Sequence, residues 1–478
     1  MAEPIQFAGE ERSNAIRRVI AKQEPEGMRT FTPSQAVLSK SAGIYHWTAE
    51  GRKLYDFSSG VLVANLGHNP RRWMQRFAEY MQWTPELVDG KHYPKSGPDT
   101  FFEGVALTAY NAITPIEAQA VERLTRSVQK TPGGQALDTV MWAASGSEAI
   151  QKALWACLHR DESRDLIIAT RYGFHGKKGL AGAVTGSEKD KDRDPRVKFI
   201  SFPMQEIDDV SKYGQEIDLS SYRKELDSLW AQYGKRLNCL ITEPYLGGGG
   251  SYHPPASYHK LLQDFCKQHD IVLIFDEVQA NFGRTGCVYA FEKYQIAPDM
   301  VVMGKGLGNG VPVAAVVARG DILSSLKYGE ASDTWSANPL SCAAVLATLD
   351  EFETLDIIGH TRKLTPIFFE GLNRLKETGL VTKVRGEGLV FGIECAACGD
   401  LDSKQVAVKC VEAGYLGNAE GEGIHFLGAL AGNVIRVSPP HVITEAEARA
   451  GLDLAYDILS ALAEKLTGKL QGAGTAAS

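Results

Sequence analysis

Short and almost uninterrupted runs of apolar residues recur through the middle of the chain, and helical patterns separate several of them. These runs predict strands at Thr139–Trp142, Leu166–Ala169, Val197–Phe202, Leu237–Thr242, Ile271–Phe275, Met300–Met303 and Val313–Ala318. Strands that are covered on both faces are apolar throughout, whereas half-exposed strands alternate apolar and polar residues. The pattern therefore predicts an α/β fold with a mostly parallel central sheet between layers of helices.

The two ends of the chain show different patterns. Near the N-terminus, the segments Gly43–Tyr45 and Leu54–Phe57 flank a turn at residues 49–51 and predict a small hairpin. Near the C-terminus the pattern predicts a helix around Ser341–Phe352 and strands at Leu389–Ile393 and Val434–Val437. We therefore expect a small α+β domain built from residues 1–66 and 341–478, packed on a large domain of residues 67–340.

A final helix is predicted from Thr444, because Thr444 and Glu447 have the spacing of a capping box. Its apolar residues share one face of the helix and are Leu452, Ala455, Leu459, Leu462 and Leu466. The glycine-rich sequence from Gly468 onward predicts a frayed tail.

Composition excludes several classes of protein. The chain has 478 residues, which is too long for a single ordinary core. Its net charge of −7 argues against binding to nucleic acid or to an anionic membrane. No apolar stretch is long enough to span a membrane, and residues 1–27 lack the apolar region of a secretory signal. We therefore expect a cytoplasmic protein.

Cysteine usage fits a reducing compartment. Eight cysteines in so long a chain do not indicate a disulfide framework. Cys395 and Cys398 form a C-x-x-C pair, but a zinc ribbon would need a second pair. We therefore expect two reduced cysteines at the end of a strand.

Two residues at strand ends carry the most informative chemistry. Lys305 follows the run Met300–Met303 on a glycine-rich turn, and Asp276 closes the run Ile271–Phe275. Ligands in open α/β folds bind beyond the carboxyl ends of the strands, so both side chains are expected at one site. Pyridoxal phosphate needs an amine that forms an imine and a carboxylate that keeps its ring nitrogen protonated. The pair therefore indicates a pyridoxal phosphate site.

A phosphate site is predicted at the start of the helix that follows the first predicted strand. The residues there are Ser145, Gly146, Ser147 and Glu148. Free backbone N–H groups and small hydroxyls at a helix N-terminus bind anions. A plain helix cap is the alternative, since Ser145 and Glu148 also have capping-box spacing. The lysine and aspartate described above favour the phosphate site.

Other ligand classes have less support. The chain contains no G-x-x-x-x-G-K-[ST] motif, and the glycines around Lys305 miss G-x-G-x-x-G spacing because Asn309 takes the sixth position. The adjacent acids Asp276 and Glu277 are weak evidence for a metal site. His253 and His259 flank prolines in a predicted loop and are expected to be structural or exposed.

Three further side chains could face the same site. Phe174 follows a predicted strand and could stack on a planar ring, although a core phenylalanine is the common alternative. Gln279 lies three residues after Asp276 and could reach the same site. Arg436 is a lone cation in an apolar run, where it is either a solvated edge residue or a bidentate partner for a carboxylate.

The segment from Leu273 to Gly286, together with Gly304-Lys305-Gly306, resembles the signature of class III aminotransferases. Residues 54–60, 65–68 and 334–340 resemble further stretches of that family. The resemblance runs from about Gly43 to the last helix. It implies the type I fold of pyridoxal phosphate-dependent transferases, with a mostly parallel sheet in the large domain and a small α+β domain. The family includes 4-aminobutyrate, ornithine, acetylornithine and ω-amine:pyruvate aminotransferases.

The resemblance also implies roles for the cofactor-binding residues. Lys305 would hold the cofactor as an imine, and Asp276 would pair with the ring nitrogen. Phe174 would stack on the ring, Gln279 would lie near its phenolic oxygen, and His175 belongs to the same set.

The phosphate of the cofactor would be bound from both subunits of a homodimer. Ser145, Gly146 and Ser147 would contact it from one subunit, and Thr334 would reach it from the other. The active site would therefore lie at the subunit interface.

Substrate recognition departs from the family pattern at two positions. Arg436 matches the arginine that binds the substrate α-carboxylate, but Gly248 stands where many members carry a glutamate that pairs with this arginine. Lys177 replaces the arginine that binds an ω-carboxylate in 4-aminobutyrate enzymes, and a lysine keeps the charge but loses the fork. The segment Trp83–Ile113 looks like an insertion that could reshape the mouth of the site.

The function implied is transfer of an amino group from an ω-amino acid or amine, such as 4-aminobutyrate, to a 2-oxo acid. The resemblance implies a ping-pong mechanism through the Lys305 imine. Decarboxylation, racemisation and an intramolecular amino shift are alternatives, because relatives on this fold catalyse each. A binding protein without catalytic activity is the third possibility, and the presence of Lys305, Asp276 and Gln279 argues against it.

Overall fold

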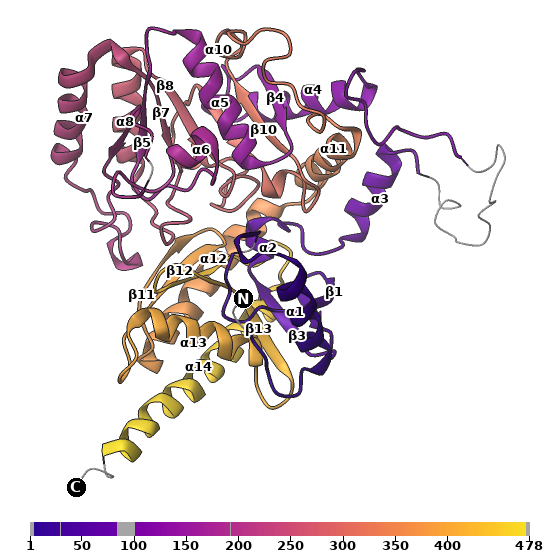
Figure 1. Ribbon diagram of the computed structural model, residues 1–478, viewed down its shortest axis with the longest axis vertical. Coiled ribbons are helices and arrows are strands. Elements are labelled where there is room, and N and C mark those ends of the chain that lie inside the picture. The colour runs from indigo at the N-terminus through magenta and orange to yellow at the C-terminus, as the bar shows by residue number, and fades with distance from the viewer. Residues whose placement is uncertain (1–3, 29, 84–100, 192, 475–478) are drawn as a thin grey trace.

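Two seven-stranded sheets organise the protein, one in each of the two bodies that lie one above the other in Figure 1. The computed structural model describes residues 4–28, 30–83, 101–191 and 193–474. The expected insertion at Trp83–Ile113 therefore falls largely outside the described residues.

The sheet of the large body forms at the positions that the apolar runs predict. Its order is β4 (Thr139–Ala143), β10 (Ala314–Ala318), β9 (Met300–Met303), β8 (Val272–Asp276), β7 (Leu237–Thr242), β5 (Leu166–Thr170) and β6 (Val197–Ile200). Neighbouring strands from β6 to β9 are parallel, and β10 runs antiparallel to both β4 and β9. The prediction of a mostly parallel sheet is confirmed. The third predicted strand is two residues too long, because β6 ends at Ile200.

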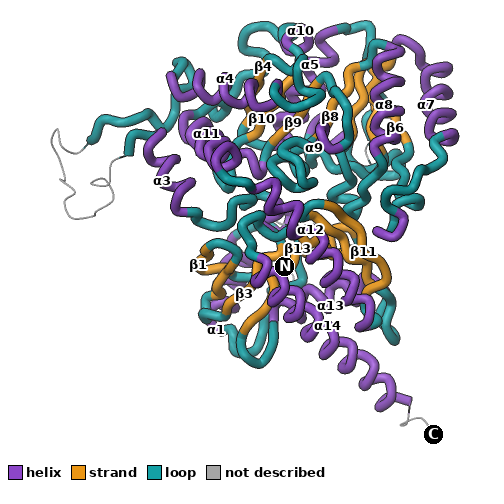
Figure 2. The backbone as a smooth tube through the Cα atoms, turned by 180° about the vertical axis from the view of Figure 1, so that it is seen from behind, coloured by secondary structure: helices purple, strands orange, loops and turns teal. Residues whose placement is uncertain are grey.

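Helices cover both faces of this sheet, which is why its strands are apolar throughout (Figures 1 and 2). One face packs against α5 (Gly146–Arg160), α6 (Gly179–Ala183) and α10 (Gly320–Leu323). The other face packs against α4 (Pro115–Gln129), α7 (Ser220–Tyr233), α8 (Ala256–His269), α9 (Ala290–Lys293) and α11 (Pro339–Thr354). The predicted helix around Ser341–Phe352 is α11, and α3 (Arg71–Tyr80) packs against it.

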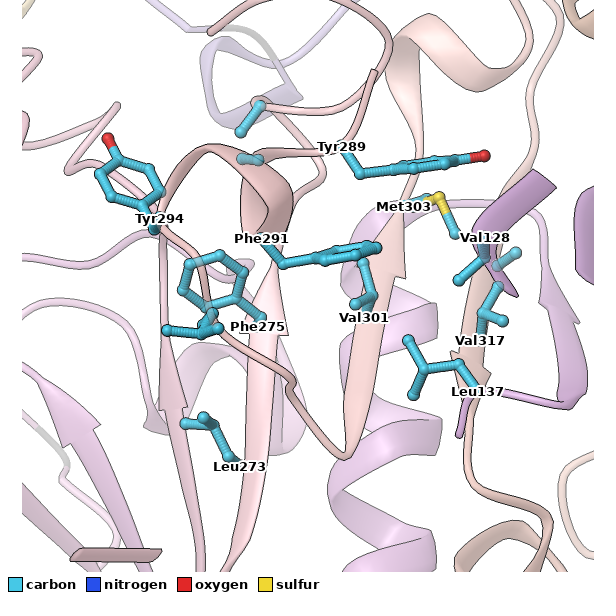
Figure 3. Packing of buried hydrophobic residues seen from close by; sticks show 14 of the residues in the cluster. Val128, Leu137, Leu273, Phe275, Tyr289, Phe291, Tyr294, Val301, Met303 and Val317 are labelled. Carbon is cyan, nitrogen blue, oxygen red and sulfur yellow. The ribbon is translucent and has the colours of Figure 1, made fainter. Parts of the chain in front are cut away.

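Large aromatic side chains fill the second of these layers (Figure 3). The rings of Tyr289 and Phe291 stack with their centroids 5.6 Å apart. In the same cluster, Val301 and Met303 project from β9 and Val317 projects from β10. Each fully buried side chain of this size contributes about 1.5–3 kcal/mol to folding, so this layer holds the carboxyl ends of the strands in place.

The small body contains a sheet built from both ends of the chain. Its order is β1 (Leu38–Ala42), β2 (Tyr45–Thr48), β3 (Lys53–Phe57), β13 (Glu422–Ala431), β14 (Val434–Val437), β12 (Val390–Cys395) and β11 (Val381–Glu387). The parallel pairing of β3 with β13 joins the N-terminal strands to the C-terminal ones. The helices of this body are α1 (Glu11–Gln23), α12 (Ile357–Arg374), α13 (Ser403–Leu416) and α14 (Glu445–Gly474).

The predicted N-terminal hairpin is present, but its first arm is misplaced. β2 pairs antiparallel with β3 and begins at Tyr45, where the predicted arm ends. Gly43 has φ +58°, so the chain turns there rather than extending. Ile44 is apolar because it is buried in this turn. The sequence pattern also missed β1, whose residues are mostly exposed.

The last helix begins as predicted and continues further than expected. Thr444 Oγ1 accepts a hydrogen bond from the Glu447 N–H at 3.2 Å, and Glu447 Oε2 accepts one from the Thr444 N–H at 2.9 Å. The expectation of a frayed tail from Gly468 is wrong as far as Gly474, where α14 ends. Extending an existing helix fixes one residue per added hydrogen bond, so the glycines do not stop it.

All eight cysteines are free, and Cys395 closes β12 as expected.

His253 and His259 are both buried. His259 lies in α8 rather than in a loop, because the helix begins directly after Pro255. Within the described ranges, no helix is long and apolar enough to cross a membrane.

Candidate active site

Lys305 and Asp276 lie beside each other because β8 and β9 are adjacent parallel strands. Asp276 is the last residue of β8 and is paired in register with Val302 of β9. Lys305 opens a single 3-10 turn directly after β9 and has φ +49°. A left-handed backbone at a residue other than glycine costs about 1–3 kcal/mol and is concentrated at functional sites. This backbone conformation places the Cβ atom of Lys305 at the carboxyl end of the sheet.

The environment of Lys305 favours its neutral amine. Burial lowers the pKa of Lys305 to about 7, and the nearby charge of Arg436 adds to this effect. Asp276 and Glu243 act in the opposite direction but do not cancel the shift. A neutral amine is a nucleophile, whereas an ammonium ion is not. Lys305 can therefore react with an aldehyde near neutral pH.

Asp276 is held on both carboxylate oxygens. Its Oδ2 lies 2.7 Å from His175 Nδ1, and its Oδ1 accepts a hydrogen bond from the Val278 N–H at 3.0 Å. His175 is 3% exposed, and its Nε2 has no hydrogen-bond partner among the described residues. Both residues were predicted for the site, and His175 is placed to orient the carboxylate.

The first turn of α5 lies near the same place. Ser145 caps the helix, and its Oγ accepts a hydrogen bond from the Glu148 N–H at 3.3 Å. A Cβ atom added to Gly146 would lie 3.0 Å from Val278 Cγ1, and one added to Gly304 would lie 3.4 Å from the same atom. The N-terminus of α5 and the turn before Lys305 therefore meet at Val278, a residue that sequence reasoning did not select.

Ser147 contacts the loop that carries Phe174 and His175. A Cβ atom on Gly176 would lie 2.2 Å from Ser147 Oγ, so this close approach requires glycine at 176. The predicted phosphate-binding residues, Ser145, Gly146 and Ser147, therefore border both the Lys305 turn and the Phe174 loop. The free backbone N–H groups at the start of a helix can bind an anion.

A buried acid that sequence reasoning missed connects two loops of the site. Glu243 Oε1 accepts a hydrogen bond from the Phe174 N–H at 2.8 Å, and Oε2 accepts one from the Gly247 N–H at 3.2 Å. Burial raises the pKa of Glu243 to about 7. Like Asp276, it is an acid at the end of an apolar run, so the same signal could have revealed it. Phe174 itself is 42% exposed and is free to contact a ligand.

Arg436 is buried without an acidic partner among the described residues. It lies in β14, an interior strand of the small sheet, so it is not a solvated edge residue. Its Nη1 donates to the Gly247 carbonyl at 3.2 Å and to Gln279 Oε1 at 3.3 Å, whereas its Nε has no partner. A buried cation with an unused donor favours an incoming carboxylate.

Two predicted residues lie apart from this cluster. Lys177 is exposed and lines a separate cavity of about 690 Å³ with Gln151 and Arg193. Thr334 is exposed in the loop before α11, next to Asp333, which pairs with Lys152 at 2.5 Å. Among the described residues, no hydrogen bond or ion pair joins either of them to Lys305 or Asp276.

Comparison with known proteins identifies the family. The family model of the class III aminotransferases matches residues 102–459. The chain belongs to the class III aminotransferase family. The acetylornithine aminotransferase of Caldanaerobacter subterraneus is 29% identical over 91% of this chain and 97% of its own length. The omega-aminotransferase of Caulobacter vibrioides is 29% identical over 87% of this chain and 91% of its own.

Solved structures show the same fold. An ornithine aminotransferase from Toxoplasma gondii matches with a TM-score of 0.75 at 21% identity, over 95% of this chain and 96% of that one. An acetylornithine aminotransferase from Elizabethkingia anophelis matches with a TM-score of 0.72 at 24% identity, over 94% and 98% of the two chains. The predicted type I fold is confirmed.

Class III aminotransferases depend on pyridoxal phosphate, and this aminotransferase has residues that fit the cofactor. Lys305 supplies an amine of lowered pKa, and Asp276 supplies a carboxylate fixed by His175. Gly146 lies at the start of α5, where free backbone N–H groups can bind a phosphate. The amine, the carboxylate and this helix N-terminus therefore suit the group.

Proposed function

We propose that this aminotransferase moves an amino group from an ω-amino acid or simple amine to a 2-oxo acid, in two half-reactions at one site. The observation that carries the proposal is Arg436, which is buried, donates to a carbonyl and an amide oxygen, and has an Nε without a hydrogen-bond partner in the described part of the chain. A carboxylate arriving there replaces two weak partners with a charge-assisted pair. The α-carboxylate of the acceptor is the natural ligand of that position.

The donor class follows from the turn opposite Arg436. Gly248 occupies the position at which many relatives carry the competing glutamate, and a Cβ atom there would lie only 2.9 Å from Phe174 Cβ. The absence of that glutamate leaves Arg436 free for the carboxylate of the acceptor. Many ω-amine enzymes of the family lack it too, and together with the curated omega-aminotransferase relative this supports a donor whose reacting amine lies at a terminal carbon.

Two residues carry out the proton chemistry in this proposal. The cofactor, when bound, accepts electrons from the carbon that bears the amine. Lys305 would hold the cofactor between turnovers, and its Nζ would take the proton from that carbon and deliver it to the cofactor. Asp276, whose carboxylate is fixed by His175 and by the Val278 N–H, would stabilise a positive charge on the ring nitrogen of the bound cofactor.

We also propose that the active site is completed in a homodimer. Thr334 is exposed in the loop before α11. The same loop exposes Tyr328 fully and Trp335 to 62%, which is unusual for side chains of this size. A second copy that covers this loop would bring Thr334 to the phosphate end of the partner's site.

The half-reactions allow a direct test of the role of Arg436. With an achiral primary amine and no acceptor, Arg436→Gln should convert the cofactor to its amine form at close to the wild-type rate. With pyruvate or 2-oxoglutarate, the return half-reaction should require at least tenfold more acceptor, because the carboxylate loses its charged partner. Lys177→Gln is the matched control and should leave acceptor affinity unchanged. Equal acceptor affinity in Arg436→Gln would contradict the proposal.

Decarboxylases, racemases and aminomutases on this fold turn over without a keto acid. Product formation from a single amine substrate in the absence of any acceptor would therefore favour one of these alternatives over amino transfer.

A further inference from the structure

Three histidines surround one buried carboxylate in the small body, away from the site described above. His46 lies in β2, Asp56 in β3 and His425 in β13, and His68 follows shortly after α2 (Ser59–Leu62). Asp56 is fully buried, and its Oδ2 lies 2.7 Å from His68 Nε2 and 3.4 Å from His46 Nε2. None of these side chains has a role in amino transfer.

We propose that His46, Asp56 and His68 bind a divalent transition-metal ion, with Zn²⁺ as the best fit. Their ligand atoms all lie within 4.8 Å of one another. In a tetrahedral zinc site with bonds of about 2.0–2.1 Å, the ligand atoms are about 3.4 Å apart. The cluster is therefore already close to the size of such a site, and water can take the fourth position. His68 is 18% exposed, which gives the ion a route of entry.

The surrounding hydrogen bonds leave one free lone pair on each of two ligands and aim it inward. Ser41 Oγ lies 2.7 Å from His46 Nδ1, and in the tautomer that carries the proton on Nδ1 the ring donates to this hydroxyl. His46 Nε2 is then an acceptor, and it is buried without a hydrogen-bond partner among the described residues. Outer partners of this kind orient metal-bound histidines.

Asp56 is arranged in the same way. Its Oδ1 accepts hydrogen bonds from the Ser58 N–H at 2.8 Å, from Ser58 Oγ at 2.7 Å and from the Ser59 N–H at 3.0 Å. These contacts occupy one oxygen and leave Oδ2 facing the histidines. An ionised carboxylate is the form that accepts three such hydrogen bonds on one oxygen, and it is also the form that binds a metal ion.

A single proton satisfies this cluster less well than a metal ion. A proton on His68 pairs with Asp56 but leaves His46 Nε2 without a partner. Protonating both histidines would place two cations in rings whose centroids are 4.4 Å apart. His425 stands edge-on to His46, with ring centroids 5.4 Å apart, and it is not one of the three residues whose ligand atoms cluster. A divalent ion can use both ring nitrogens and the carboxylate at once.

The position of the cluster suggests a structural role for the ion. Asp56 anchors Ser58 and Ser59, which open the left-handed segment 59–62, with φ between +49° and +67°. Val61 is β-branched, so this conformation is strained and needs support from its surroundings. Ser59 Oγ also accepts a hydrogen bond from Arg284, near the active site. An ion at Asp56 would therefore hold the segment that crosses between the two bodies.

The test uses tag-free holoenzyme, stripped with a chelator and passed through a desalting column to remove free cofactor. Zinc is then added and excess removed, and the bound metal is measured by mass spectrometry and the melting temperature by calorimetry. We expect about one zinc ion per chain and a higher melting temperature that the chelator reverses. A wild-type protein that retains no zinc, with an unchanged melting temperature, would overturn the proposal.

Two variants locate the site. His46→Phe should retain less than about a tenth of the wild-type zinc, provided that circular dichroism shows a folded protein. Ser41→Ala is milder and should weaken zinc binding by about 10–100-fold through the lost outer contact. Ser39→Ala, two residues away on the same strand, is the matched control and should bind zinc as the wild type does. Equal zinc binding by the wild type, His46→Phe and Ser41→Ala would place the metal elsewhere.

Discussion

At the scale of single residues, the side chains proposed for catalysis lie at the ends of the apolar runs. Asp276 and Lys305 could be predicted because each lies at the end of a buried strand. A charged side chain is costly to bury there, so its presence indicates a function. Glu243 carries the same signal and was missed. Lys177 was predicted for the substrate but lies on a separate cavity within one subunit, because its place depends on loop geometry that sequence periodicity does not describe.

The lowered pKa of Lys305 predicts how the apoenzyme takes up its cofactor. Only the neutral amine reacts with an aldehyde, so the rate of uptake should rise as the pH passes through about 7 and level off above about 8. Stopped-flow absorbance of apoenzyme mixed with pyridoxal phosphate measures this rate. In Arg436→Gln the midpoint should move to higher pH, because a nearby positive charge is removed. A midpoint above 9 in the wild type would contradict this description of the site.

At the scale of elements, apolar runs reveal the strands of the large sheet but not all strands of the small one, where β11 and β13 were missed as well as β1. All strands of the large sheet were found because burial on both faces makes them apolar. β1 was missed because its residues Leu38–Ala42 are mostly exposed. The end of α14 was wrongly predicted to fray, because glycines in an existing helix cost only about 1 kcal/mol each.

Gly248 lies in the turn after β7, and an acid introduced there would lie near Arg436. Gly248→Glu should place a carboxylate that competes with the acceptor for Arg436, and should raise the KM for 2-oxo acids about tenfold or more. The new side chain also crowds Phe174, since a Cβ atom would lie 2.9 Å from Phe174 Cβ. Gly248→Ala introduces the crowding without the charge and is the control. Equal KM values for the two variants would show that crowding, not charge, causes the effect.

At the scale of the whole molecule, one buried arginine joins the segments that sequence patterns treat separately. Arg284 donates to Asn65 Oδ1 at 2.7 Å, to Ser59 Oγ at 2.8 Å and to the Pro439 carbonyl at 2.5 Å. It therefore ties both chain ends to the loop after Asp276. No periodicity could predict these contacts, because they link residues that are more than a hundred positions apart in the chain.

Buried neutral histidines predict the response of the whole fold to acid. Burial lowers the pKa of His259 and His425 to about 4, and that of His441 well below its usual value. Between about pH 6.5 and pH 4 the unfolded chain binds protons that the folded chain excludes, so the free energy of unfolding falls as the pH falls. Each such histidine contributes about 1.4 kcal/mol per pH unit, and above about pH 6.5 the contribution is constant.

Urea unfolding at a series of pH values measures this slope. His259→Gln keeps a side-chain N–H that can reach the Pro244 carbonyl, which lies 2.8 Å from His259 Nε2. The variant should lower the slope between pH 4 and pH 6.5 by about one proton. Comparison at pH 7.5 separates the effect of protonation from any change in packing. An unchanged slope would show that His259 takes up a proton in the folded state.

The most direct test of the central claim is the position of the cofactor attachment. Holoenzyme is reduced with borohydride, digested, and its peptides are sequenced by mass spectrometry. We predict one pyridoxyl group per chain, on Lys305, and none in Lys305→Ala. A label on any other lysine, or no label in a protein that carries the cofactor, would contradict the assignment of the active site.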